Sequence, residues 1–137
     1  MPKLSELKPG DALPERQHLA TNVSLFLYNA AVWNAHRIHY DEPYTTDVEN
    51  HPGVIIDGPL QGDWLSQVVL DWLEDSGQLL EFEYTNRRAS ILGETLTAGG
   101  SVKAIDGTQV VVELFIRNEA GDITTPGQAL VQLADGA

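Results

Sequence analysis

The most regular pattern of apolar positions along the chain lies between Pro59 and Gly77. Apolar side chains recur there at helical spacing, at Leu60, Trp64, Leu65, Val68, Val69, Trp72 and Leu73. Gln61 and several acidic residues occupy the rest of the helix circumference. Because proline suits the first turn of a helix and glycine the position past its end, the pattern predicts one long amphipathic helix between them.

Alternating apolar and polar residues after this helix predict β-strands with one buried face. The alternation is clearest at Leu80, Phe82 and Tyr84, and again at Ala129, Val131 and Leu133. The turn sequences "DG" (106–107) and "AGD" (120–122) separate the apolar runs between them. We expect four strands after the long helix and one before it, over residues 15–20. This order predicts an α+β fold in which an antiparallel sheet curls around the helix.

A shorter helix is expected over "TNVSLFLYNAAVW", residues 21–33, with Thr21 or Asn22 as its cap. Its apolar residues at helical spacing are predicted to be buried: Val23, Phe26, Leu27, Ala30 and Ala31. Prolines and a glycine in residues 41–53 indicate a loop or a short helical turn, which Asp41 is expected to cap.

Length and composition limit the classes of protein to consider. The 137 residues suit a single domain, and the absence of cysteine excludes disulfides and thiolate chemistry. No apolar run approaches the roughly 20 residues that cross a bilayer, and the N-terminus lacks a secretory signal, so we expect a cytoplasmic protein. The net charge of −12 disfavours nucleic acid and membrane surfaces as partners, because their phosphates are bound by neutralising them.

The chemistry of the chain is concentrated in "NAHRIHYD", residues 34–41. This stretch holds two of the four histidines, and histidine changes protonation near neutral pH. His36 and His39 are therefore candidates for proton transfer. A metal site formed by His36, His39 and Asp41 is an alternative reading, but no further ligand is evident, so no metal or redox cofactor is expected. Two histidines at this spacing are also compatible with no function at all.

This segment, together with "HPGVIIDGPLQGDWL" (51–65), resembles the MaoC-like acyl dehydratases, which are (R)-specific enoyl thioester hydratases of the hot-dog fold. The resemblance is strongest to the subgroup of mesaconyl-C4-type hydratases and mitochondrial 3-hydroxyacyl-carrier-protein dehydratases. It places His39 at the catalytic histidine, Asn34 at the usual catalytic aspartate and Gly58 at the glycine that opens the central helix. Three departures stand out: the amide of Asn34, the pair His36-Arg37 in place of Asn-Pro, and Asp57 where histidine is common.

The resemblance implies a hydro-lyase of fatty acid metabolism that reversibly hydrates a 2-enoyl thioester to a 3-hydroxyacyl thioester. Neutral His39 would take a proton from a water held by Asn34, and the Gly58 N–H would stabilise the enolate oxygen. Contacts with the substrate are expected from His36, Arg37, Asp57, Arg87 and Arg88, although a solvated strand end is the favoured reading of the last two. The implied substrate is an acyl-CoA rather than an acidic carrier protein, and the implied assembly is a homodimer.

Two alternative functions are compatible with the same architecture. A thioesterase would use a carboxylate of the long helix, Asp63 or Asp71, to activate water. A non-catalytic hot-dog subunit would complete the site of another chain or bind acyl-CoA without turnover, and the amide of Asn34 favours this reading. Among the remaining residues, Trp33 and Tyr40 are expected in the core or a pocket wall, and His18 and His51 on the surface without a role.

Overall fold

The computed structural model describes residues 1–134. Its elements follow one another in this order: β1 (Ala12–Leu19), α1 (Asn22–Ala31), the 3-10 helix η1 (Arg37–His39), α2 (Glu42–Asp47), α3 (Gly58–Leu73), β2 (Gly77–Tyr84), β3 (Thr95–Asp106), β4 (Gln109–Arg117) and β5 (Ile123–Leu133). No helix within the described residues is long and apolar enough to cross a membrane.

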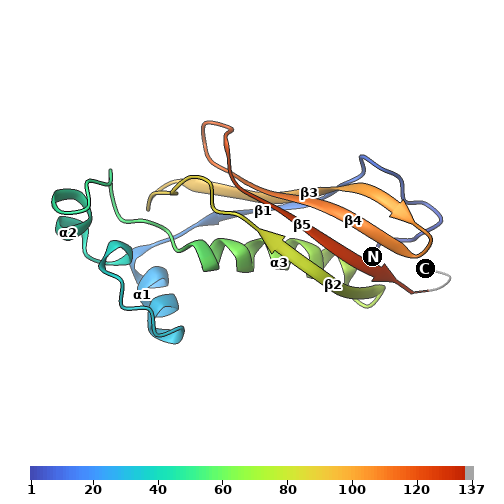
Figure 1. Ribbon diagram of the computed structural model, residues 1–137, viewed down its shortest axis with the longest axis horizontal. Coiled ribbons are helices and arrows are strands. Elements are labelled where there is room, and N and C mark those ends of the chain that lie inside the picture. Colours follow the sequence, from blue (N-terminus) through green and yellow to red (C-terminus); the bar gives the residue numbers. More distant parts are fainter. Residues whose placement is uncertain (135–137) are drawn as a thin grey trace.

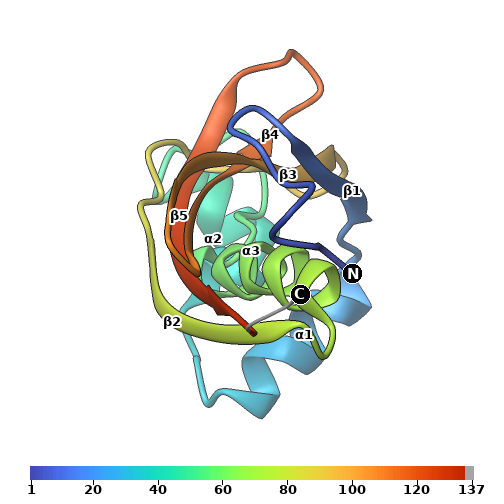
Figure 2. The same ribbon diagram turned by 90° about the vertical axis from the view of Figure 1, so that its right-hand side faces the viewer.

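The five strands form one antiparallel sheet in the order β1-β3-β4-β5-β2. The sheet curls around α3, which runs along its inner side (Figures 1 and 2). Hairpins join β3 to β4 and β4 to β5, and Gly107 (φ 61°) and Gly121 (φ 87°) supply the left-handed backbone of the two turns. The expected α+β architecture and the expected number of strands are confirmed.

Helix α3 supplies much of the core. Its predicted apolar face is buried at Trp64, Leu65, Val68, Val69 and Leu73. The predicted end was wrong: the helix stops at Leu73, Glu74 has a positive φ of 48°, and Gly77 already belongs to β2. Gln61 was assigned to the polar face but is buried, because it lies one turn before Leu65 on the side that meets the sheet.

Helix α1 has its predicted position, and Thr21 caps it in a reciprocal pair of hydrogen bonds with Ser24. Its buried face was predicted incorrectly. Leu25 and Asn29 are the buried residues, whereas Phe26 is 63% exposed and Val23 and Leu27 are exposed to a similar extent. The reason is its location: α1, η1 and α2 lie together at one end of the elongated molecule, beyond the sheet (Figure 1).

Two further expectations need correction. The alternation in β2 shifts at an irregularity between Leu79 and Glu81, so Leu80 is exposed and Leu79 packs on the core instead. His18 is not a passive surface residue: its ring stacks on Trp64 with centroids 4.3 Å apart. Burial, with a smaller effect of the Arg16 charge, lowers the pKa of His18 below its usual 6.5.

Candidate active site

The amino end of α3 meets η1 and the loop after α1, and this junction fixes the ring of His39. His39 is 8% exposed, and its Nδ1 lies 2.7 Å from the Ile55 main-chain oxygen. A carbonyl oxygen only accepts hydrogen bonds, so Nδ1 carries the proton in the neutral ring and Nε2 holds the basic lone pair. Within residues 1–134, Nε2 makes no hydrogen bond and is not among the fully enclosed polar atoms. The ring is therefore oriented as a base with its free nitrogen accessible.

The residue before this helix is a fully buried carboxylate, Asp57. Its Oδ1 accepts a hydrogen bond from Asn29 Nδ2 at 3.0 Å, and its Oδ2 accepts one from Asn34 Nδ2 at 3.4 Å. Nδ1 of His39 lies 3.5 Å from the same Oδ1. The carboxylate was expected to contact the substrate, but the chain's own N–H groups enclose it. It stands at the cap position of α3 without capping the helix through its side chain.

Asn34 is held in a defined orientation between two parts of the site. Its Oδ1 accepts a hydrogen bond from the His36 main-chain N–H at 3.0 Å, while its Nδ2 donates to Asp57. An amide has two N–H groups and two lone pairs, so one of each stays free for a water molecule. His36 itself is exposed, and its ring meets that of His39 edge-on with centroids 5.8 Å apart.

Gly58 is the first residue of α3, where backbone N–H groups lack a partner inside the helix. Its N–H makes no hydrogen bond to any other residue of 1–134. The structure adds a second reason for glycine here, because a Cβ would overlap Nδ2 of Asn86. Oδ1 of Asn86 lies 3.1 Å from the Thr125 hydroxyl, whose single proton is shared between this oxygen and Oε1 of Gln61. Sequence reasoning missed Asn86 because it approaches this position only through the fold.

A buried network of hydrogen bonds around Gln61 holds the start of α3 against the sheet. Oε1 of Gln61 accepts hydrogen bonds from the hydroxyls of Thr125 (3.0 Å) and Ser90 (3.5 Å). Its Nε2 donates to the main-chain oxygen of Ile56 at 3.3 Å. The network ties the segment that carries Asp57 and Gly58 to the sheet, which limits movement of the helix end.

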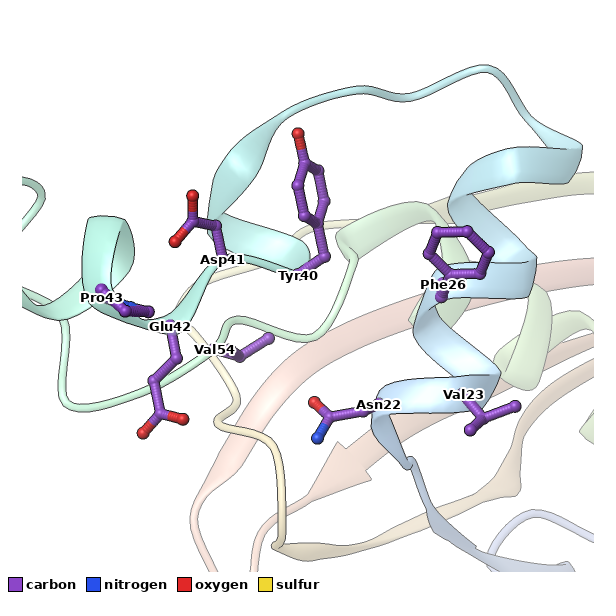
Figure 3. A pocket seen from close by; sticks show the side chains of 8 residues that line it. All are labelled: Asn22, Val23, Phe26, Tyr40, Asp41, Glu42, Pro43 and Val54. Carbon is purple, nitrogen blue, oxygen red and sulfur yellow. The ribbon is translucent and has the colours of Figure 1, made fainter.

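Two pockets open between α1 and the turn that follows it, and they share Phe26 and Tyr40 as walls. The larger, of about 590 Å³, is bounded by α1 on one side and the start of α2 on the other (Figure 3). The smaller, of about 340 Å³, is mostly apolar and is lined by Phe26, Asn29, Ala30, Trp33, Asn34, Ala35 and Tyr40. It reaches the two asparagines that donate to Asp57, so it is the pocket that adjoins the polar cluster.

Tyr40 and Trp33, which were expected in the core or in a pocket wall, line the wall of the smaller pocket. Tyr40 is half exposed, and its hydroxyl donates to the main-chain oxygen of Ala35 at 3.1 Å. Trp33 is 95% exposed and has a φ of 58°, so it is not a core residue.

The basic residues expected near the substrate lie on the surface. Arg37 donates two hydrogen bonds to Oδ2 of Asp41, at 3.0 and 2.8 Å, and lies 4.1 Å above the ring of Tyr44. These hydrogen bonds from Arg37 lower the pKa of Asp41, which also caps α2 as predicted. Arg87 and Arg88 follow β2 and are exposed; Arg88 pairs with Asp122 at 3.1 Å. A phosphate would have to compete with these acidic partners.

The residues considered for a metal site and for a thioesterase do not lie together at this site. Among residues 1–134, no three histidine, aspartate or glutamate side chains are placed to hold a metal ion, and Asp41 faces Arg37 instead of His39. On α3, Asp71 is exposed and bonded to Arg16, and Asp63 is exposed. His51 is half-buried in the loop before α3 rather than fully on the surface.

Comparison with known proteins places the chain in a family. The family model for hydroxyacyl-thioester dehydratase type 2 matches residues 3–92, more than half of the chain. A mesaconyl-C(4)-CoA hydratase of Chloroflexus aurantiacus is 53% identical over 36 residues, which are 26% of this chain and 13% of that protein. The mitochondrial hydroxyacyl-thioester dehydratase type 2 of Schizosaccharomyces pombe is 42% identical over 40 residues, 29% of this chain and 13% of that protein. The matched segments thus span a small part of either relative.

The fold is shared more widely than the sequence. An R-hydratase from Pseudomonas aeruginosa, solved without ligand, superimposes with a TM-score of 0.84 over 96% of this chain and 84% of that one, at 20% identity. The likeness confirms the expected hot-dog fold, and the family match confirms the resemblance seen around "NAHRIHYD". The chain is a member of the hydroxyacyl-thioester dehydratase type 2 family.

Proposed function

We propose that this chain catalyses the reversible hydration of a 2-enoyl thioester to a 3-hydroxyacyl thioester. The orientation of His39 carries the proposal: Nδ1 is committed as a donor to Ile55, which leaves Nε2 as a base beside the amino end of α3. The names of the family and of both curated relatives agree with hydration or dehydration of acyl thioesters.

In this mechanism Nε2 of His39 removes a proton from a water molecule that the free amide valences of Asn34 orient. The resulting hydroxide adds to C3, and the electron pair of the double bond moves toward the thioester oxygen. The Gly58 N–H, at the positive end of the helix dipole, stabilises that oxygen. Nε2 then returns its proton to C2, so one water molecule is added and the imidazole is neutral again. Dehydration follows the same steps in reverse.

We propose that the acyl group enters the smaller pocket, since this is the apolar space that borders Asn34. The thioester is expected to carry coenzyme A, because acyl carrier proteins are acidic and this chain already has a net charge of −12. The phosphates of coenzyme A would be met at the surface by Arg87 and Arg88, with Arg37 and His36 nearer the opening. Each arginine that is paired now would exchange its carboxylate for phosphate oxygens.

We further propose a homodimer. Four exposed apolar side chains lie on α1 and the following turn, at one end of the molecule: Val23, Phe26, Leu27 and Trp33. Exposed apolar surface of this kind favours association, because its burial removes it from water. A cytoplasmic location stays a prediction from the sequence, to be tested by cell fractionation.

A second candidate is a non-catalytic subunit. The observation in its favour is Asn34, since an amide cannot carry a proton where the resemblance expects an aspartate. The two functions are separated by one assay: the purified chain is mixed with crotonyl-CoA and with longer 2-enoyl-CoAs, and loss of the enoyl thioester and release of free thiol are followed. Loss of enoyl absorbance without thiol supports hydration. Thiol release would indicate a thioesterase, and binding without either change would indicate a non-catalytic subunit.

A further inference from the structure

The buried carboxylate of Asp57 is the least expected polar group of the molecule. Removing an ionised carboxylate from water is costly unless donors replace the lost hydrogen bonds. Two N–H groups from separate segments do so here, contributed by Asn29 of α1 and Asn34 of the following loop, and Nδ1 of His39 lies 3.5 Å away. None of these donors belongs to α3, which Asp57 immediately precedes.

Asn29 holds this carboxylate from the side of α1. It is 5% exposed on the inner side of α1, and its Nδ2 donates both to the main-chain oxygen of Leu25 (2.8 Å) and to Asp57. Its Oδ1 is enclosed and has no partner among the described residues, an unfavourable arrangement that an apolar side chain would avoid. The amide therefore acts through its N–H groups, one of which orients Asp57.

We propose that Asp57 is a positioning residue for His39: its carboxylate keeps the ring with Nδ1 inward and stabilises the imidazolium that forms when Nε2 takes the proton of water. This inference rests on the hydration proposed above. It adds a role that Ile55 cannot fill, because a neutral carbonyl fixes the tautomer but does not compensate a positive charge. A carboxylate oxygen 3.5 Å from Nδ1 supplies the negative charge that compensates it.

The charged surroundings of His39 favour this assignment. Asp57 faces it from the start of α3, and the ring of His36 meets it from the same turn. Arg37 and Asp41, the other charged residues of this turn, are paired with each other. Among residues 1–134, Asp57 is therefore the carboxylate that contacts the ring, and its removal leaves no other negative charge beside Nδ1.

The test compares the wild type with Asp57→Asn, with Asp75→Asn as matched control because Asp75 is an exposed carboxylate beyond the far end of α3. Asp57→Asn is expected to lower kcat by about 100-fold, within the range for loss of general base function. The acid limb of its pH–rate profile is expected to move to lower pH, because the imidazolium has lost its counter-charge. Asp75→Asn should match the wild type. If Asp57→Asn does not fold, Asp57→Ser keeps an acceptor in less space and carries the same measurement.

An NMR measurement separates this inference from the proposed function. The wild type should show a protected, downfield Nδ1–H resonance of His39, and Asp57→Asn should move it upfield and speed its exchange with solvent. That result supports the positioning role even if the chain hydrates none of the enoyl thioesters tested. An unchanged resonance, or a fall in rate with an unchanged pH profile, would mark Asp57 as a structural residue only and overturn the inference.

Discussion

Nδ1 of His39 lies 2.7 Å from the main-chain oxygen of Ile55, a residue two positions before Asp57. This contact links the histidine of η1 to the segment that leads into α3, so the base and the Gly58 N–H are held by one short stretch of backbone. Gln61 also holds this stretch, because its Nε2 donates a hydrogen bond to the main-chain oxygen of Ile56. Relative movement of the two groups is thereby limited, which preorganises them for one substrate.

The glycine at position 58 is predicted to be required for space as well as for its N–H. Gly58→Ala keeps the N–H but places a methyl group against Nδ2 of Asn86. Unless the exposed Asn86 side chain turns away, the helix end must shift, and a shift of this kind is expected to reduce kcat/KM by about 100-fold. The double variant with Asn86→Ala should recover much of that loss when measured beside Asn86→Ala alone. Full activity of Gly58→Ala, or no recovery in the double variant, would contradict the packing role.

Replacing Asn34 by aspartate is predicted to be harmful, although it restores the residue that the family resemblance expects. Nδ2 of Asn34 lies 3.4 Å from Oδ2 of Asp57, so Asn34→Asp would bring two carboxylates together in a poorly hydrated place. The free energy of unfolding should fall by about 1–3 kcal/mol at pH 8. The loss should shrink on acidification, because one of the two carboxylates then takes up a proton. Denaturant unfolding at pH 8 and pH 5 measures the loss of stability and its dependence on pH. A variant as stable as the wild type at pH 8 would refute the prediction.

His18 is predicted to make stability depend on pH. Its pKa is lowered in the folded chain, mainly by burial, from the ordinary value of 6.5. Well above pH 6.5 the ring is neutral in both the folded and the unfolded chain, so it does not reduce the free energy of unfolding. As the pH falls below this value, the unfolded chain takes up a proton that the folded chain does not, so the free energy of unfolding decreases.

Substitution by phenylalanine keeps a ring against Trp64 but cannot titrate. The wild type should therefore lose more stability than His18→Phe between pH 7.5 and pH 5.5, as measured by denaturant unfolding. Parallel pH dependences of the two proteins would show that His18 does not contribute.

The apolar face of α1 is predicted to lie in a subunit interface. Phe26 (63% exposed) and Trp33 (95% exposed) are substituted together by serine, with Ile123→Ser as control because Ile123 is also exposed but begins β5. Light scattering after gel filtration should show a dimer for the wild type and the control, and a monomer for the double variant at the same concentration. A monomeric wild type, or an unaffected dimer in the double variant, contradicts the proposal.

The fold could be predicted from the sequence where one local pattern decides the structure. The stripe from Trp64 to Leu73 and the turns at Gly107 and Gly121 are of this kind, since each is set by neighbours in the sequence. The buried face of α1 was predicted incorrectly because an apolar stripe has the same spacing whether it packs on the core of its own chain or lies on the surface. Its location at the end of the molecule is determined by the tertiary arrangement.

The candidate site was only partly predictable for the same reason. His39, Asn34 and Gly58 were found through the motif and the helix start, and the structure brings them to one place. Asn29 and Gln61 were missed, although each lies four residues from a buried leucine on the inner side of its helix, a polar exception that could have been noticed. Asn86 gave no such signal, because its contact with Gly58 spans the fold.

Hydration of crotonyl-CoA by the purified chain and by its His39→Gln variant tests the assignment of the base most directly. Glutamine keeps a donor for the main-chain oxygen of Ile55 but has no basic nitrogen, so the variant should fold normally. We expect the wild type to hydrate crotonyl-CoA and the variant to be slower by about 100-fold or more. Equal rates in the two folded proteins would contradict the role of His39 as the base of this site.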